Sequence, residues 1–270
     1  MKFCNAHIAA FGLMGLLAGS ASAATVAQYN FDSFQSDPPP VVADMSGNGH
    51  DVTWSANNYA ELDTWDPFNV DDSKSVVVNY NTGLISNPGT INLNNGGSSQ
   101  FTFEGWVRPA SSGIDSDLVT LNSDQGGNTT QLTLAVIGST GQAYGRVYNG
   151  GGPSLTSSNN ALVIDQWNYL ALVYDGNNAR LYIKNSNYPT LTEVATALDA
   201  GKSMPTYMTQ SWVASTSASW YTGFDDIRIS DTALSDAQLG YHASFTPVPE
   251  PASLSLLGLG ALVMIRRRKA

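Results

Sequence analysis

Side chains that carry oxygen ligands gather at two points of the sequence. Asp44 and Asn48 stand in a glycine-rich stretch that ends at Asp51, and Asp225 and Asp226 are adjacent near the C-terminal end. Calcium takes about six to eight hard oxygens, which carboxylates, Asn side chains and turn carbonyls supply. We therefore predict a structural Ca²⁺ site with ligands from Asp44, Asn48 and at most one of Asp225 and Asp226, because neighbours on a strand point to opposite faces. The alternative is that Asp44 and Asn48 close a turn and that Asp226 pairs with Arg228 or solvent.

Paired carboxylates of the kind that hydrolyse glycosides occur in one segment. Glu61 to Asp66 resembles the Glu-x-Asp-x-x-Glu strand of laminarinase-type enzymes, whose two carboxyl groups lie about 5–5.5 Å apart in retaining hydrolases. Its last acid is the shorter Asp66, and Pro67 interrupts what should be a central strand. We therefore predict no catalytic residue and no enzyme activity, with a glycoside hydrolase as the alternative.

Aromatic side chains in or near loops are candidates for stacking on sugar rings. Trp106 and Trp167 lie within apolar strand patterns and are expected to pack in the core. The candidate sugar contacts are Trp54, Trp65, Trp212, Trp220 and Tyr221.

The N-terminal residues 1–23 have the pattern of a secretory signal peptide. Lys2 precedes an apolar stretch, and small residues lead to Ala21 and Ala23, the Ala-x-Ala context of signal peptidase cleavage. Cleavage there removes Cys4, the single cysteine of the chain.

The C-terminal residues 247–270 carry a different signal. Pro249, Glu250 and Pro251 are followed by an apolar run to Ile265, about 21 Å long as a helix against a hydrocarbon core of about 30 Å. Basic residues then end the run, namely Arg266, Arg267, Arg268 and Lys269. This combination resembles the PEP-CTERM sorting signal of Gram-negative bacteria. The resemblance implies recognition by an exosortase, transient residence of the tail in the inner membrane, and delivery to the cell surface or extracellular matrix.

The charge of the chain excludes one class of partner. The 270 residues carry a formal net charge of −10, and between the two terminal signals 7 basic residues face 21 acidic ones. Nucleic-acid binding needs a basic face that replaces phosphate counterions, so we expect no nucleic-acid partner.

The region between the signals is predicted to be all-β. Short segments with alternating apolar residues are separated by Gly, Asn, Ser and Pro, which indicates a two-sheet antiparallel jelly-roll sandwich. A hairpin is expected at Asp175–Asn178 because Gly and Asn tolerate positive φ, and a helix is expected only at Ser235–His242. The predicted strands are 26–31, 51–55, 75–80, 100–108, 117–122, 131–137, 143–148, 167–174, 180–184, 212–215 and 223–229.

Four segments in order resemble the LamG-like (laminin G, subtype 3) domains of the concanavalin A-like superfamily. They are 29–51, Phe101–Pro109, Gln166–Ile183 and Gly223–Ser235. The resemblance implies the same jelly roll and adds weight to a structural calcium ion. The chain departs from the family after Tyr182, where Lys184 and Asn185 replace the usual Asp-Gly and are expected to alter a turn without altering the fold.

The sequence thus predicts a signal peptide (1–23), one LamG-like domain (24–246) and a sorting tail (247–270). We expect an exported, non-catalytic module at the surface or in the matrix of a Gram-negative bacterium. It would bind an extracellular polysaccharide or another matrix polymer, with a protein–protein adhesion domain lacking a sugar site as a further alternative.

Overall fold

The computed structural model describes fourteen stretches of the chain. They are 25–32, 41–54, 60–63, 75–78, 84–86, 91, 93–95, 98–109, 113, 115–125, 128–149, 154–198, 210–216 and 222–240. The signal peptide, the sorting tail, Trp65, Trp220 and Tyr221 lie outside them. Within these residues no helix has the length and apolarity that a membrane crossing needs.

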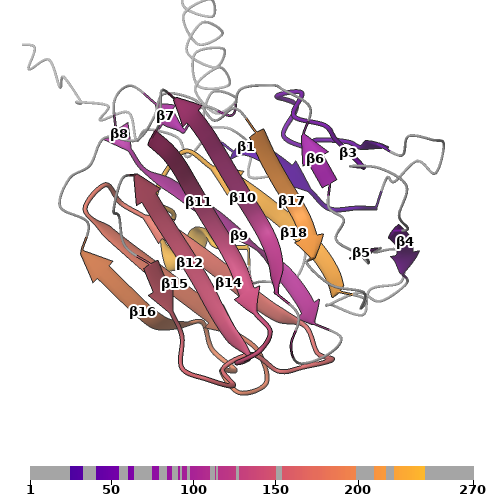
Figure 1. The fold of residues 1–270 in the computed structure, drawn as a ribbon, viewed down its shortest axis with the longest axis vertical. Helices are drawn as coiled ribbons and strands as arrows, with labels where there is room; N and C mark the ends of the chain where they lie inside the picture. Colours follow the sequence, from indigo (N-terminus) through magenta and orange to yellow (C-terminus); the bar gives the residue numbers. More distant parts are fainter. Residues whose placement is uncertain are drawn as a thin grey trace, which may run out of the picture.

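Two antiparallel sheets form stacked layers (Figure 1). In sheet A the strand order is β16-β15-β14-β9-β18-β5-β4, with β1 paired to β18 beside this path. Its strands are β1 Thr25–Tyr29, β4 Ala60–Asp63, β5 Ser75–Val78, β9 Phe101–Pro109, β14 Asn168–Tyr174, β15 Asn178–Lys184, β16 Thr192–Leu198 and β18 Thr222–Ser230.

Sheet B has the order β13-β12-β11-β10-β17-β6-β3-β2. Its strands are β2 Val41–Val42, β3 Val52–Trp54, β6 Leu84–Ser86, β10 Ser116–Gln125, β11 Asn128–Ile137, β12 Gln142–Asn149, β13 Ser154–Thr156 and β17 Gln210–Thr216. A separate two-stranded sheet pairs β7 Asn94–Asn95 with β8 Ser98–Ser99. The predicted all-β sandwich is confirmed, and each of the eleven predicted strands overlaps an observed one.

The main core lies between the sheets and follows from the alternation of the strands. On β9, Phe101, Phe103 and Val107 are fully buried in this core, whereas Trp106 belongs to a second apolar cluster on the other face of sheet A. Phe101 contacts Phe103 and Tyr174 with ring centroids 4.6 and 5.4 Å apart. We call the face of each sheet that points away from the main core its outer face.

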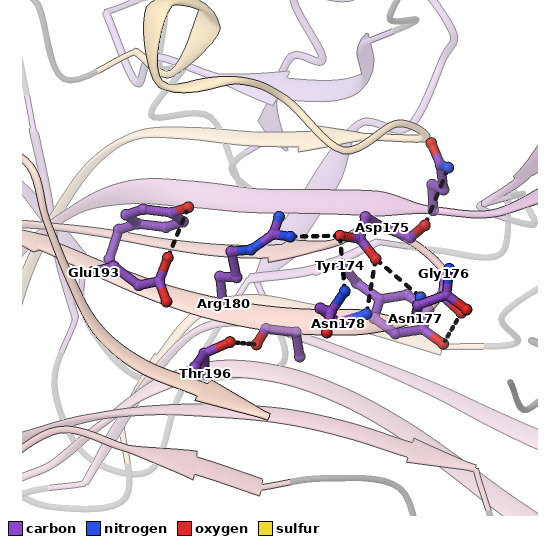
Figure 2. Close-up of polar contacts among 11 residues, drawn as sticks. Tyr174, Asp175, Gly176, Asn177, Asn178, Arg180, Glu193 and Thr196 are labelled. Carbon is purple, nitrogen blue, oxygen red and sulfur yellow. Dashed lines mark hydrogen bonds and ion pairs between the residues drawn. The ribbon is translucent and has the colours of Figure 1, made fainter. Parts of the chain in front are cut away.

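The predicted hairpin between β14 and β15 is confirmed, and Figure 2 shows its turn. Asp175 carboxylate oxygens accept hydrogen bonds from the backbone N–H groups of Asn177 and Asn178, at 2.9 and 2.7 Å, while Gly176 takes φ +91°. Arg180 donates to the other carboxylate oxygen at 2.7 Å. Burial raises the pKa of Asp175, but these donors and the Arg180 charge outweigh it and hold the pKa below its ordinary value.

The predicted helix at Ser235–His242 is wrong in length. The structure has a single 3₁₀ turn, η1 Asp236–Gln238, preceded by Ser235 as its N-cap residue. The Gln238 side chain accepts hydrogen bonds from the Ser235 backbone N–H and hydroxyl, at 3.0 and 2.8 Å. Leu239 is already extended (φ −68°, ψ 138°) and 2% exposed, so burying its side chain takes precedence over continuing the helix.

Candidate functional site

The outer face of sheet B carries a row of polar side chains that crosses four strands. The backbone register pairs Thr120 of β10 with Thr133 of β11, Thr133 with Arg146 of β12, and Arg146 with Ser154 of β13. The neighbouring register pairs Leu121 with Leu132, which are both fully buried in the main core. Alternation therefore places apolar residues inward and this polar row outward.

The polar row is buried at its Thr120 end and more exposed at its Ser154 end. The hydroxyl of Thr120 donates to that of Thr133 at 3.3 Å, and both residues are 5% exposed. Arg146 and Tyr144 are half-buried, Ser154 is exposed, and the Tyr144 and Ser154 hydroxyl oxygens lie 3.4 Å apart. At about 4.8 Å between strands, the row from Thr120 to Ser154 spans about 14 Å. Tyr144 lies beside the row, two residues before Arg146 on the same face of β12. Hydroxyls, a guanidinium and a phenol ring together offer donors, acceptors and a flat apolar surface, the contacts that a sugar chain uses.

Two of the aromatic candidates lie on strands of sheet B. Trp54 ends β3, and Trp212 of β17 is paired with Thr120 of the polar row and with Ile85 of β6. The backbone positions of Trp212 and Thr120 are thus neighbours, while the side chains of both Trp residues lie outside the described part. Trp65, Trp220 and Tyr221 are outside it altogether. Trp106 is 7% exposed and packs in the apolar cluster on the outer face of sheet A, as expected, and half-buried Trp167 packs against the same cluster.

Asp44 and Asn48 fasten the first strand. One Asp44 carboxylate oxygen accepts from the backbone N–H groups of Gln28 and Ser46, both at 2.9 Å, and the other accepts from the Ser46 hydroxyl at 2.7 Å and the His50 N–H at 3.1 Å. The Asn48 amide donates to the carbonyl oxygen of Thr25 at 2.9 Å. In this arrangement the Asp44 oxygens accept hydrogen bonds from protein donors and close a turn.

Asp225 and Asp226 are both buried, at 1% and 9% exposure, as is every residue of β18. The pairing of β18 with β9 shifts register between Asp225 and Arg228, and Asp226 adopts φ +46°. The Asp226 backbone N–H donates to the Asp225 carboxylate at 2.8 Å. The bulge interrupts the regular alternation of the strand at these two residues. Among the described residues, no group of three or more His, Cys, Asp or Glu is arranged to hold a metal ion, and calcium binding stays a prediction.

The sequence analysis missed a charged network on the outer face of sheet A. Glu104 of β9 is fully buried and forms an ion pair with Arg228 of β18, which is 9% exposed. The Tyr169 hydroxyl donates to Glu104, as does the Gly240 backbone N–H at 2.8 Å. Burial and the Glu104 charge raise the pKa of Tyr169 well above its ordinary value. The sequence signal was Glu104, the one acidic residue of a largely apolar strand, but its partner Arg228 lies 124 residues away.

The hydrolase-like segment begins in an edge strand of sheet A. Glu61 and Asp63 belong to β4, the last strand of sheet A, where they pair with Val77 and Ser75 of β5. Asp66 lies outside the described residues.

The departure from the LamG-like pattern forms a turn around the buried side chain of Asn185. Asn185 accepts from the backbone N–H groups of Asn187 and Tyr188, each at 2.9 Å, and its amide donates to Asn168 at 2.7 Å. The strands on either side of the turn, β15 and β16, are present.

Comparisons with known proteins agree with this architecture. Domain 4 of AbnA, a GH43 extracellular arabinanase from Geobacillus stearothermophilus solved in complex with arabinotriose, superposes with a TM-score of 0.52 at 18% identity, covering 80% of this chain and 97% of that one. The botulinum neurotoxin serotype C1 binding domain gives 0.48 at 14% identity, covering 78% and 49%. Trypanosoma rangeli sialidase in complex with sialic acid gives 0.48 at 10% identity, covering 78% and 31%. A search of curated proteins finds no match.

Two family models match separate parts of the chain. The model of the PEP-CTERM protein-sorting motif matches residues 247–269, which indicates processing by an exosortase and export to the cell surface or the extracellular space. The model of the concanavalin A-like lectin/glucanases superfamily matches residues 79–240, more than half of the sequence. The chain is therefore an exported, PEP-CTERM-sorted member of the concanavalin A-like lectin/glucanase superfamily.

Proposed function

We propose that this protein is a non-catalytic module that binds an extracellular polysaccharide or other glycan polymer through the outer face of sheet B. The observation that carries the proposal is the polar row from Thr120 to Ser154, with half-buried Tyr144 and Arg146 beside exposed Ser154. The arabinotriose complex of AbnA domain 4 shows a sugar ligand in a protein of similar fold, and the likeness extends to the fold alone.

The polar row contains one positively charged side chain, that of Arg146, in a domain with an excess of acidic residues. Arg146 is the one Lys or Arg in the strands of sheet B, whereas the region between the two signals carries 21 acidic residues. A guanidinium presents several N–H donors in a fixed plane and suits hydroxyl or carboxylate oxygens of a sugar chain.

Glycan binding by the processed protein, as released from producing cells, tests the proposal. We expect binding to one class of polysaccharide on a glycan array, weakened at least about tenfold in the R146Q variant, a loss of about 1.4 kcal/mol. The matched control is K184Q, which removes one positive charge from β15 of sheet A and should leave binding unchanged. Equal losses in both variants would point to net charge and not to this face.

Two further outcomes would redirect the proposal. Absence of binding to every glycan, together with retention on a matrix protein, would favour an adhesion domain. Release of reducing ends from the bound polysaccharide, abolished in an E61Q variant, would favour the glycoside hydrolase.

A further inference from the structure

The last described residues form a strap across the outer face of sheet A. The strap is Asp231–Gly240, and its two leucines, Leu234 and Leu239, are 6% and 2% exposed. They pack in one cluster with Trp106 and Tyr169, whose ring centroids lie 5.4 Å apart. The strap therefore covers an apolar patch that, if exposed, would favour association with other molecules.

Side chains of β9 and β18 hold both ends of the strap. At its start the Thr102 hydroxyl donates to the Thr232 carbonyl at 2.8 Å and accepts from the Leu234 N–H at 2.9 Å. At its end Glu104 accepts from the Gly240 N–H at 2.8 Å, and Arg228 donates to the Gln238 carbonyl at 2.7 Å. Gly240 is thus fixed to the outer face of sheet A.

The sorting motif follows the strap after a short connection. The match to the motif begins at residue 247, so residues 241–246 separate it from Gly240. Six residues span at most about 20 Å when fully extended. The polar row of sheet B lies on the opposite side of the main core, because the two sheets share that core on their inner faces.

From this geometry we propose that the strap is an orienting device. It holds Gly240 at the outer face of sheet A, with six residues between Gly240 and the sorting motif, so that a chain held in the membrane by its tail directs the outer face of sheet B away from the bilayer. The functional benefit of this orientation rests on the proposed function, because the unprocessed chain would then bind its polymer while its tail is still in the membrane. The orientation itself does not depend on any ligand.

Cysteine labelling of the full chain tests the orientation without a glycan. In a C4A background, S154C reports on sheet B and A237C reports on the strap, because both positions are exposed. The chain is incorporated by its tail into vesicles of phosphatidylethanolamine and phosphatidylglycerol and treated with a maleimide carrying a polyethylene glycol chain. Compared with the processed protein in solution, labelling of A237C should slow several-fold and labelling of S154C should not change.

Lengthening the connection supplies the control. A flexible Gly/Ser insertion after residue 240 leaves the strap contacts in place but frees the domain to tumble, so the protection of A237C should fall as the insertion grows. Equal labelling of both sites in the vesicles, stronger protection of S154C, or failure of the vesicles to retain the chain would overturn the proposal. Loss of glycan binding with this labelling pattern intact would instead refute the proposed function alone.

Discussion

The outer faces of the two sheets differ in their side chains: that of sheet A carries an apolar cluster and a buried ion pair, whereas that of sheet B carries a polar row. On sheet A the strap covers Trp106 and Tyr169, and the charges of Glu104 and Arg228 are buried against each other. On sheet B the outward-facing residues are polar: Thr120 and Thr133 are buried, Tyr144 and Arg146 are half-buried, and Ser154 is exposed. A covered apolar face contributes stability, whereas polar side chains that reach the solvent can contact a ligand. For this reason the proposed glycan site is assigned to sheet B and not to sheet A.

The largest expected effect comes from breaking the buried ion pair of sheet A. The E104A substitution leaves the Arg228 guanidinium buried without its partner and removes the acceptor of the Gly240 N–H. Removing one member of such a pair costs about 3–5 kcal/mol in the free energy of unfolding, measured by urea denaturation. The control is E193A, at an exposed position of edge strand β16, with an expected loss of about 0.5 kcal/mol or less. Equal losses in the two variants would mean that the network does not hold the sheet.

A smaller loss is expected where Asp44 fastens β1 to the turn between β2 and β3. The D44A substitution removes an acceptor of four hydrogen bonds and should cost about 2–3 kcal/mol, because buried N–H donors lose their partner. Chelation separates this explanation from calcium. If hydrogen bonds alone close the turn, excess EDTA leaves the melting temperature of the wild-type protein unchanged.

A fall in melting temperature with EDTA would instead support a bound ion, because a ligand of the native state must stabilise it. If D44A then abolished the EDTA effect, the calcium ligands would include Asp44 despite its hydrogen bonds.

The free energy of unfolding should depend on pH in the alkaline range because two tyrosines of sheet A are buried. Burial raises the pKa of Tyr29 and Tyr169, with added contributions from nearby carboxylates. Below about pH 10 both tyrosines are protonated in the folded and unfolded chains and add no pH dependence. Above it the unfolded chain releases protons that the folded chain retains, so stability falls by up to about 1.4 kcal/mol per pH unit for each tyrosine. Urea titrations across this range should show a shallower decline for Y169F, and an unchanged slope would contradict the assignment.

Sequence patterns predicted the strands well and the polar contacts between distant strands poorly. Phe101 to Val107 alternate, so the inner and outer positions of β9 could be assigned from the sequence alone. The partner of Glu104 could not, because an ion pair across 124 residues leaves no local periodicity. Strand β16 was missed because its residues 192–198 are half-exposed on both faces and carry little alternation.

Positions without regular geometry are also hard to predict. The bulge at Asp225 and Asp226 depends on how β18 pairs with β9, which a single strand does not encode. Ser235–His242 predicts a helix because Ala237, Leu239 and Tyr241 follow a capping serine. Packing of Leu234 and Leu239 on Trp106 favoured one short turn instead. Gly223 illustrates the same dependence on distant residues, since a Cβ there would lie 3.1 Å from the Trp167 ring.

The smallest expected effect tests whether the outer face of sheet B is dispensable for the fold. Thr120 and Thr133 form one hydroxyl–hydroxyl contact at 3.3 Å, and both are 5% exposed. T120V alone leaves the Thr133 hydroxyl buried without that partner and should cost about 1 kcal/mol. The double variant T120V/T133V replaces both hydroxyls by methyl groups of similar shape, so most of that loss should be recovered. A double-mutant cycle by urea denaturation measures this coupling. Additive losses near those of E104A would show that sheet B depends on its polar outer face as much as sheet A depends on its buried charges, and the contrast between the two faces would then fail.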